Sequence, residues 1–464
     1  MEHFSDVENL TRKLFGSSGV RGLVNADLTP VLAAEIGLAV AASSRARKVL
    51  VARDTRVSGL ILENAVVSGL VSGGAGVDCL GVVPTPVLSF LTTEVRADAG
   101  VMITASHNPP QYNGIKIFDR DGMAYDEQSQ NCIENIVEHQ RFKRADWPRL
   151  GQAKFADHKR LYTEMIRKNV KLNKKWHLVV DPGCGATYEL APEVLNDLGC
   201  KVTALNAQPD GFFPARSPEP NARSLSDLAQ VVRILHADVG LAYDGDGDRV
   251  AFIDGEGSFV DFDPVLAAYA AHVAKQKRGS LIVTNVEASM CIEEMVKENG
   301  GKVMRTKVGD AYVSEAVEKH HAVFGGEPCG AWIHPQFHHC PDGILSSILL
   351  LKALEDADKT LAELVAETPQ YPILRENIAS SEEEKLMIVQ KVGEDLKTTF
   401  PKYLQLSTVD GVRLSVKNGW ILIRASGTEP VVRLTVEGES LKAAREIMQK
   451  GALSVKTALG RCKR

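Results

Sequence analysis

Hydrophobic and polar positions along the chain follow a pattern that occurs three times. Each copy has a short aliphatic run, a turn of small or polar residues, an amphipathic segment with helical periodicity, a glycine-marked end and a second aliphatic run. The copies begin at Val49, Leu178 and Leu281, and the first two place helices at 60–72 and 186–198. Parallel strands need helical crossovers, and strands covered on both faces are aliphatic throughout. The pattern therefore predicts three tandem, related α/β domains with mixed sheets.

The C-terminal part of the chain has a different pattern. The charged segment 382–397 has helical periodicity, segments 411–416 and 420–424 have the character of strands, and a final helix is expected from Ser440. This mixture predicts an α+β domain rather than a fourth copy. We expect four domains with the limits 1–154, 155–255, 256–370 and 371–464.

Composition and charge favour a protein that acts on small molecules. The 464 residues include 54 Lys and Arg against 59 Asp and Glu, so the formal net charge is −5. This balance argues against a main role in neutralising nucleic-acid phosphates.

No apolar run reaches the roughly 20 residues that cross a bilayer, and the N-terminus lacks a signal peptide's basic and apolar segments. Eight cysteines without a CxxC pair are typical of reduced thiols. We expect a cytoplasmic monomer or homodimer with a small-molecule partner, and neither nucleic acid nor membrane.

The first candidate site is a polar, proline-terminated turn at 104–110, which follows the apolar run 99–103. Open α/β sheets bind ligands at the carboxyl ends of their strands, where this turn is expected. Ser106 supplies a hydroxyl nucleophile, and His107 and Lys116 are suited to move protons or bind phosphate. An ordinary Asx-Pro turn also explains these residues, and composition alone favours that interpretation.

The second candidate site is the acidic segment 244–249, with the sequence Asp-Gly-Asp-Gly-Asp-Arg. The glycines let the backbone curl so that alternate carboxylates converge, and such hard oxygen ligands suit Mg²⁺ or Ca²⁺. An EF-hand is excluded because Arg249 stands where that loop requires glycine. A solvated acidic turn is the alternative. Three clustered like charges repel each other without a cation, which favours the metal site.

Two further turns have the composition of ligand-binding loops. Segment 424–430, with Arg433 shortly after it, combines arginine, hydroxyls and glycine N–H groups that suit phosphate, although a plain hairpin turn has similar residues. Segment 325–330 is a glycine-rich turn in which Glu327 is suited to accept hydrogen bonds from ligand hydroxyls.

Other familiar motifs are absent from the sequence. The glycine-rich segment 15–22, which contains Arg21, lacks GxGxxG spacing, and no GxxxxGK[ST] motif occurs. Cysteines and histidines between 329 and 340 have no spacing typical of tetrahedral zinc. Nucleotide-driven and zinc-dependent chemistry therefore lose support.

Four of these loops, in this order and each in a separate predicted domain, resemble those of the α-D-phosphohexomutase family. The family comprises phosphoglucomutases, phosphomannomutases and phosphoglucosamine mutases. The matching segments are 104–116, 244–249, 325–330 and 424–433, and the resemblance spans nearly the whole chain. It implies three related α/β domains and a smaller α+β domain around a central cleft, and it is closest to archaeal-type phosphoglucosamine mutases.

The resemblance also implies roles for individual residues. The family's phosphoserine would be Ser106, which with three aspartates would bind one Mg²⁺: Asp244, Asp246 and Asp248. Phosphate contacts and proton transfer at the reaction centre would come from Arg21, His107, Lys116 and Arg249. The sugar hydroxyls would contact Glu327 and Cys329. The substrate's non-reacting phosphate would bind to Arg424, Ser426, Gly427, Thr428 and Arg433.

The chemistry implied by the family interconverts hexose 6-phosphate and hexose 1-phosphate. The phosphoserine would transfer its phosphoryl group to the substrate, and a bound hexose 1,6-bisphosphate would serve as intermediate and activator. Phosphoryl transfer depends mainly on charge stabilisation and positioning, which a metal ion and arginines supply. We expect glucosamine phosphate as the favoured substrate.

Three alternatives remain open at this point. The sugar loop has Cys329 and Ala331 where many relatives have serine and histidine. A phosphomannomutase or phosphoglucomutase with a broad sugar range is therefore the alternative within the family. A non-catalytic phosphosugar-binding regulator and a metal-dependent phosphatase are the alternatives from other classes. Ser106 and the three intact aspartates argue against the regulator.

Overall fold

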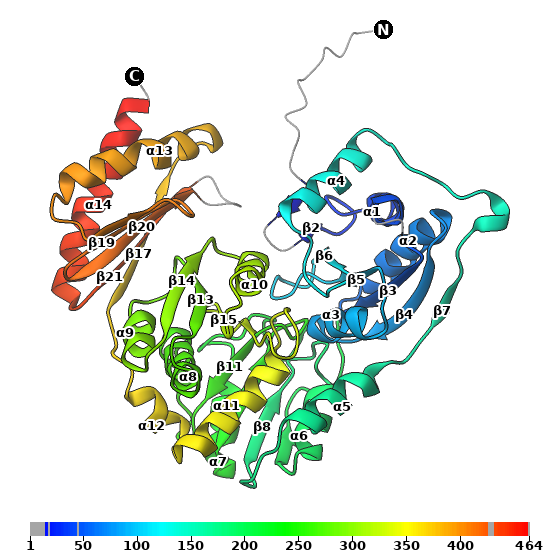
Figure 1. The fold of residues 1–464 in the computed structure, drawn as a ribbon, viewed down its shortest axis with the longest axis horizontal. Coiled ribbons are helices and arrows are strands. Elements are labelled where there is room, and N and C mark those ends of the chain that lie inside the picture. The colour runs from blue at the N-terminus through cyan, green and yellow to red at the C-terminus, as the bar shows by residue number, and fades with distance from the viewer. Residues whose placement is uncertain (1–13, 17–18, 44–45, 426–430, 463–464) are drawn as a thin grey trace.

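The computed structural model describes residues 14–16, 19–43, 46–425 and 431–462, which form four sheets with associated helices (Figure 1). Three α/β units follow one another, and an α+β unit forms the separate lobe at the C-terminal end. The predicted fold class is confirmed. The predicted domain limits stay a prediction.

The first sheet has seven strands in the order β1-β2-β6-β5-β3-β4-β7. Strands β3, β4, β5 and β7 pair in parallel, whereas β1, β2 and β6 are joined by antiparallel pairing. The aliphatic run that predicted the first repeat is the buried strand β3. The strands are β1 (Phe15–Gly16), β2 (Gly19–Leu23), β3 (Lys48–Arg53), β4 (Gly76–Val82), β5 (Ala99–Ile103), β6 (Tyr112–Asp119) and β7 (Ala153–Phe155).

The helices of this unit are α1 (Pro30–Ser43), α2 (Gly59–Ser72), α3 (Thr85–Glu94) and α4 (Glu127–Glu138), followed by the short 3₁₀ helix η1 (Trp147–Arg149). Helices α1 and α2 approach closely because Gly69 has no side chain. A Cβ at Gly69 would lie 2.1 Å from the carbonyl oxygen of Ala34. Helix α2 agrees with the predicted helix at 60–72.

The second sheet has five strands in the order β12-β11-β10-β8-β9, with parallel pairing on both sides of β8. Its elements are α5 (Lys159–Asn169), β8 (His177–Asp181), α6 (Leu190–Asp197), β9 (Lys201–Ala204), α7 (Ser226–Leu235), β10 (Val239–Tyr243), β11 (Val250–Ile253) and β12 (Phe259–Val260). The helix predicted at 186–198 begins only at Leu190. Pro192 is accommodated only in the first turn of a helix, and residues 186–189 form turns instead. The N–H of Ala186 donates to the carbonyl of Gly245 at 2.9 Å, which holds this segment against another loop.

The third sheet has four strands in the order β14-β13-β15-β16. Its parallel strands β14, β13 and β15 again follow a strand–helix–strand plan, and β16 pairs antiparallel with β15. The elements are α8 (Phe262–Gln276), β13 (Leu281–Asn285), α9 (Cys291–Glu298), β14 (Lys302–Thr306), α10 (Asp310–Lys319), β15 (Phe324–Gly326), β16 (Trp332–Ile333), α11 (Gly343–Ala357) and α12 (Leu361–Ala366).

The fourth sheet is antiparallel, in the order β17-β21-β20-β19-β18, and α13 and α14 pack against it (Figure 1). Both expected C-terminal helices and both expected strands are present. The elements are β17 (Ile373–Ala379), α13 (Glu382–Thr399), β18 (Gln405–Ser407), β19 (Val412–Val416), β20 (Gly419–Ala425), β21 (Val431–Gly438) and α14 (Leu441–Cys462).

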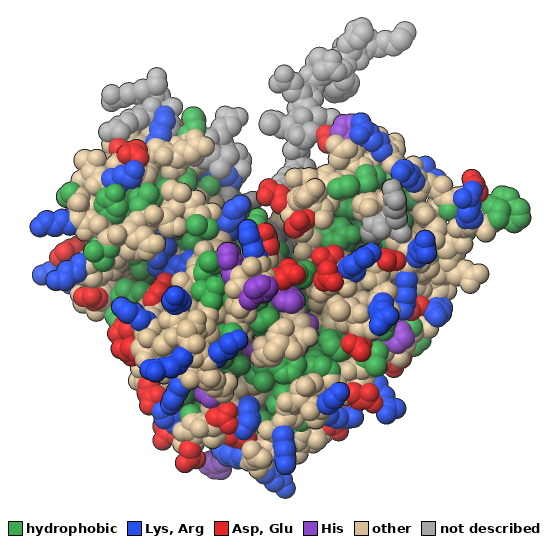
Figure 2. Space-filling view, in the orientation of Figure 1, with side chains coloured by type: hydrophobic (Ala, Val, Ile, Leu, Met, Phe, Trp, Pro, Cys, Tyr) green, Lys and Arg blue, Asp and Glu red, His purple; other side chains and the backbone are tan. Residues whose placement is uncertain are grey.

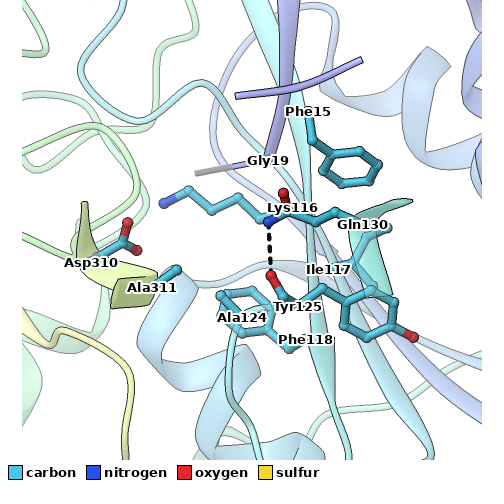
Figure 3. Close-up of a pocket in the computed structure, with 10 residues that line it drawn as sticks. All are labelled: Phe15, Gly19, Lys116, Ile117, Phe118, Ala124, Tyr125, Gln130, Asp310 and Ala311. Atoms are coloured by element: carbon cyan, nitrogen blue, oxygen red, sulfur yellow. Dashed lines mark hydrogen bonds between the residues drawn. The ribbon is translucent and has the colours of Figure 1, made fainter. Parts of the chain in front are cut away.

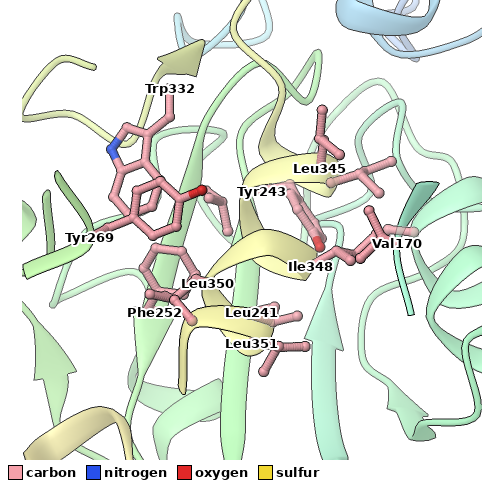
Figure 4. Packing of buried hydrophobic residues seen from close by; sticks show 14 of the residues in the cluster. Val170, Leu241, Tyr243, Phe252, Tyr269, Trp332, Leu345, Ile348, Leu350 and Leu351 are labelled. Atoms are coloured by element: carbon pink, nitrogen blue, oxygen red, sulfur yellow. The ribbon is translucent and has the colours of Figure 1, made fainter. Parts of the chain in front are cut away.

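One hydrophobic cluster runs through the first three units, and each of these units also has a separate cluster of its own. The C-terminal unit has its own core. Helix α11 supplies Leu345 and Ile348 to the shared core, beside Tyr243 of the second sheet (Figure 4). Trp332 of the third sheet and Tyr269 of α8 stack at 5.0 Å between ring centroids in the same core. No described helix is long and apolar enough to span a bilayer.

Candidate active site

Ser106 lies in the turn between β5 and β6, and its side chain reaches the second domain. Its Oγ donates to Oδ2 of Asp244 at 2.6 Å, although the two residues are 138 positions apart. The same Oγ lies 3.2 Å from Nδ1 of His107. Ser106 is buried and has the left-handed backbone angle φ = 50°. The fold therefore brings the hydroxyl predicted to react next to the acidic turn.

The three aspartates of the β10–β11 turn converge as the sequence predicted. Ligand oxygens of Asp244, Asp246 and Asp248 lie within 4.8 Å of one another, and all three residues are buried. Oδ1 of Asp246 and Oδ1 of Asp248 are buried without a hydrogen-bond partner. Buried polar atoms are normally paired, and carboxylate oxygens are preferred ligands of Mg²⁺. The donor set therefore fits a hard divalent cation.

Lys116 of β6 and Thr85 of α3 complete the surroundings of these aspartates. Nζ of Lys116 donates to Oδ2 of Asp246 at 2.9 Å and to Oδ2 of Asp248 at 2.6 Å. The Thr85 hydroxyl donates to Oδ2 of Asp246 at 2.6 Å. Burial opposes the charge of Lys116, but the two aspartates and Asp310 raise its pKa. Lys116 is therefore a cation at neutral pH.

The aspartates differ in their affinity for protons. Burial, followed by the charges of Asp248 and Asp246, raises the pKa of Asp244. Burial also opposes the charge of Asp246, but Lys116 and the Thr85 hydroxyl outweigh it and lower the pKa of Asp246. A divalent cation would favour the ionised form of all three carboxylates.

Two arginines, Arg21 and Arg249, lie near His107, the residue next to the serine. Nη1 of Arg21 on β2 donates to the Asn108 side chain at 2.8 Å. Burial, followed by the charges of Arg249 and Arg21, lowers the pKa of His107 to about 2. His107 is therefore neutral at physiological pH, and its ring nitrogens can take part in hydrogen bonds.

Glu219, which was not predicted from the sequence, lies between Arg249 and His107. Its carboxylate is 3.4 Å from Nη1 of Arg249 and 3.7 Å from Nε2 of His107. Glu219 belongs to the segment 207–225, which has no helix or strand. A Pro-Glu-Pro sequence is its only local signal, and nothing in that signal indicates a partner more than a hundred residues upstream.

Asp310, at the start of α10, was also missed. It faces Lys116 across a cavity of about 20 Å³ that Phe15 and Tyr125 also line (Figure 3). Asp310 follows Gly309 at the carboxyl end of β14, where α/β sheets place ligand-binding residues. The strand-end position is the signal that could have identified it.

The predicted sugar loop is the turn between β15 and β16. Oε1 of Glu327 accepts hydrogen bonds from the Asn285 amide at 2.7 Å and from the N–H of Gly309 at 2.9 Å. Burial, followed by the charge of Asp310, raises the pKa of Glu327 to about 7. Burial raises the pKa of Cys329 to about 12, so its thiol is protonated. The turn presents one carboxyl group and one neutral thiol.

The predicted phosphate loop joins β20 to β21, and Arg424 and Arg433 are register partners on these strands. Arg424 contacts Glu287 of the third domain and binds Asp410 at 2.8 Å. The loop residues Ser426, Gly427 and Thr428 lie outside the described residues. A cavity of about 910 Å³ extends from Arg424 to Lys307 and to Tyr125 of the first domain. Figure 2 shows a hollow with charged side chains between the C-terminal lobe and the rest of the molecule.

His334 and His338 have hydrogen-bond partners within the protein. Nε2 of His334 lies 2.9 Å from the Ser346 hydroxyl, and Nε2 of His338 lies 3.0 Å from Oδ2 of Asp342. Within the described ranges, the aspartate triad is the only cluster with metal-site geometry.

Comparisons with known proteins agree along the whole chain. The family models "Phosphoglucomutase/phosphomannomutase, alpha/beta/alpha domain" I, II and III match residues 12–144, 160–257 and 261–371. The model of the C-terminal domain matches residues 377–453. The chain belongs to the phosphoglucomutase/phosphomannomutase family. It is an isomerase of the phosphohexomutase type.

Relatives of this phosphohexomutase include two archaeal proteins, each named a probable phosphoglucosamine mutase. The one from Methanothermobacter thermautotrophicus is 42% identical and covers 94% of this chain and 96% of its own length. The one from Methanopyrus kandleri is 44% identical with the same coverage, 94% and 96%.

Two solved structures are also similar to this phosphohexomutase. A phosphoglucomutase/phosphomannomutase family protein from Burkholderia thailandensis has a TM-score of 0.88 at 29% identity, covering 96% of this chain and 97% of its own. A putative phosphomannomutase from Thermus thermophilus has a TM-score of 0.80 at 26% identity, with coverage of 95% and 98%.

Proposed function

We propose that the protein is a phosphoglucosamine mutase that interconverts glucosamine 6-phosphate and glucosamine 1-phosphate. A phosphoserine at Ser106 and a bound hexose 1,6-bisphosphate would be its intermediates. The decisive observation is the 2.6 Å contact between Ser106 Oγ and Asp244, which joins the hydroxyl to a buried triad suited to a cation. The names of the archaeal relatives support glucosamine phosphate as the substrate.

Asp244, Asp246 and Asp248, together with an oxygen on Ser106, are the proposed ligands of one Mg²⁺. Bound there, the ion would neutralise charge on the transferred phosphoryl group. The buried Oδ1 atoms of Asp246 and Asp248, which have no hydrogen-bond partner, support this assignment. Lys116 holds the opposite oxygens of the same two carboxylates and so orients them.

The chain's own side chains would orient the serine and balance charge during transfer. His107 is neutral, and its Nδ1 lies 3.2 Å from the serine oxygen, so its ring would orient the Ser106 side chain by a hydrogen bond, whereas a pKa of about 2 makes it a poor base for the serine proton. Arg21, Lys116 and Arg249 would stabilise the negative charge of the phosphoryl oxygens.

The other proposed contacts hold the substrate. Glu327 and Cys329 would contact sugar hydroxyls, and the fixed Oε1 of Glu327 leaves Oε2 for this purpose. The non-reacting phosphate would bind to Arg424, Arg433 and the loop residues Ser426, Gly427 and Thr428. Two separate phosphate sites let either end of the sugar face Ser106 in turn.

A phosphomannomutase or phosphoglucomutase with a broad sugar range is the second candidate. It is supported by Cys329, a weaker hydrogen-bonding group than a serine hydroxyl, and by the names of the Burkholderia and Thermus structures.

The test supplies purified protein with Mg²⁺, a trace of hexose 1,6-bisphosphate and, separately, the phosphates of glucosamine, glucose and mannose. Phosphorus NMR follows the products. We expect isomerisation, fastest with glucosamine phosphate, that is lost in Ser106→Ala and kept in Ser68→Ala, an exposed serine bonded to its own helix. Release of inorganic phosphate alone would indicate a phosphatase. Binding without turnover, in protein phosphorylated on Ser106, would indicate a regulator.

A further inference from the structure

A buried arginine outside the proposed site residues holds the backbone of the Ser106 loop. Arg56 follows β3 and is 1% exposed. Its Nη1 donates to the carbonyl oxygens of Pro109 at 2.7 Å and Tyr112 at 2.9 Å. Its Nη2 donates to the carbonyl oxygens of Ser106 at 2.8 Å and Asn108 at 2.6 Å. One guanidinium group therefore fixes four carbonyl groups of one turn.

Asp54 connects this arginine to the other end of Ser106. Nε of Arg56 donates to Oδ2 of Asp54 at 3.0 Å, and the Thr104 hydroxyl donates to the same oxygen at 2.7 Å. The Thr104 hydroxyl in turn accepts the N–H of Ser106 at 2.9 Å. We call Asp54, Arg56 and Thr104 the Asp54 network. It holds both the N–H and the carbonyl group of Ser106.

The conformation held by this network is uncommon for a residue with a side chain. Ser106 has φ = 50°, in the left-handed region, and such angles persist only where the surroundings enforce them. The second domain leaves little room for adjustment, because a Cβ at Gly245 would lie 2.5 Å from the Ser106 carbonyl oxygen. In this conformation Oγ points at Asp244.

We propose that Asp54, Arg56 and Thr104 are positioning residues, which keep Ser106 in the left-handed conformation that aims its oxygen at the metal site. This inference rests on the proposed function, since it concerns the geometry of phosphoryl transfer from Ser106. A buried ion pair contributes little net stability but enforces one arrangement when every hydrogen bond is made. Alignment of the reacting oxygen before substrate binds lowers the barrier of the chemical step.

Lysine cannot replace Arg56 in this role. Guanidinium has five donors in a rigid plane, whereas the lysine ammonium is a single charged centre with three donors. Arg56→Lys keeps the charge beside Asp54 and loses most of the carbonyl contacts. Thr104→Val keeps the shape of that side chain and removes the acceptor for the Ser106 N–H.

The experiment measures mutase kinetics and the phosphorus NMR signal of phosphorylated Ser106 in both variants. We expect kcat to fall roughly 100-fold, as for a misplaced reacting group, with KM within about threefold of the unmodified protein. The phosphoserine signal should shift. The matched controls are Arg53→Lys and Thr92→Val. Arg53 pairs with Glu63, reaches only the backbone carbonyl of Asp54, at 3.5 Å, and makes no bond to the Ser106 loop. The Thr92 hydroxyl bonds within its own helix. Neither control should change kcat or the signal.

Folded variants that keep kcat within about threefold of the unmodified protein would overturn the proposal. So would a rise in KM at constant kcat, because that pattern reports binding rather than alignment. If Arg56→Lys does not fold, the kinetics and the phosphoserine signal of Thr104→Val test the proposal. Absence of isomerisation in the unmodified protein would reject the proposed function itself. An active unmodified protein with unchanged variants would reject only the positioning role.

Discussion

Two buried carboxyl groups in this site differ in protonation behaviour because their neighbours differ. Lys116 contacts Asp246 and lowers its pKa against the effect of burial. Glu327 is equally buried, but its close neighbour Asp310 is another carboxylate, and its pKa rises to about 7. Composition cannot reveal this difference, because it depends on which residues lie within a few ångströms.

Replacing Glu327 by glutamine should change how stability depends on pH. The pKa of Glu327 is about 7 in the folded protein against an ordinary 4.5, so its protonation stabilises the fold at low pH, and that contribution is lost as pH rises through 7. Glutamine keeps an acceptor for Asn285 and Gly309 and cannot ionise. We expect Glu327→Gln to gain stability relative to the unmodified protein between pH 5 and pH 8, by up to about 3 kcal/mol.

Thermal and urea unfolding of both proteins across this pH range measures the effect. The exposed Glu394→Gln serves as the control. A stability difference that stays constant with pH would contradict the prediction.

At the scale of elements, backbone contacts join the predicted sugar loop, the β15–β16 turn, to β11, the strand that follows the three aspartates. The N–H of Val250 on β11 donates to the carbonyl oxygen of Gly330 at 3.1 Å. Gly330 has φ = 85°, and a Cβ there would lie 2.2 Å from the Val250 carbonyl oxygen. The β15–β16 turn can therefore dock on β11 only with glycine at this position.

Gly330→Ala should displace the sugar loop and raise KM. Its matched control is Gly279→Ala, because Gly279 has φ = 80° with open space around its Cα. The control should lose about 1 kcal/mol of stability through backbone strain alone. Gly330→Ala should lose about 1–3 kcal/mol more, because the added methyl group also overlaps the backbone of β11. Unfolding experiments measure the stability of both variants, and steady-state kinetics measures their KM. Equal losses of stability in Gly330→Ala and Gly279→Ala would contradict the steric explanation.

At the scale of the whole molecule, the C-terminal domain is joined to the rest by few contacts. A small cluster of Val286, Trp420 and Leu422 and the polar contacts of Glu287 and Asp410 connect it to the third domain. Domains with separate cores and small interfaces move relative to one another. The contact of Arg424 with Glu287 occupies a guanidinium that we propose binds phosphate.

Glu287→Ala should therefore strengthen phosphosugar binding, because the substrate phosphate no longer competes with this carboxylate. Partly exposed ion pairs contribute up to about 1 kcal/mol, so we expect Kd to fall by no more than about fivefold. Calorimetry with glucosamine 6-phosphate in a Ser106→Ala background measures Kd without turnover. Glu394→Ala, which removes an exposed pair within one helix, is the control. An unchanged or weaker affinity for Glu287→Ala would contradict the prediction.

Much of this architecture was predictable from local sequence. The aliphatic run at Val49 forms β3, and the periodic segment 60–72 is the helix α2. The alternating aspartates converge because the glycines between them allow a tight turn. The helix predicted from 186 starts at Leu190, because Pro192 is accommodated only in the first turn of a helix. The Ala186 N–H holds the preceding turn against another loop, a long-range contact that periodicity cannot report.

The sequence by itself determined the three α/β repeats, the α+β domain and the loops with reactive side chains, because periodicity and turn composition are local properties. Only the tertiary structure placed Ser106 against Asp244, Glu219 against His107 and Arg56 beneath the serine loop. Each of these contacts joins segments that are distant in sequence, so the fold of the whole chain decides them. The identity of the chemical groups was local information, whereas their alignment and protonation depend on packing.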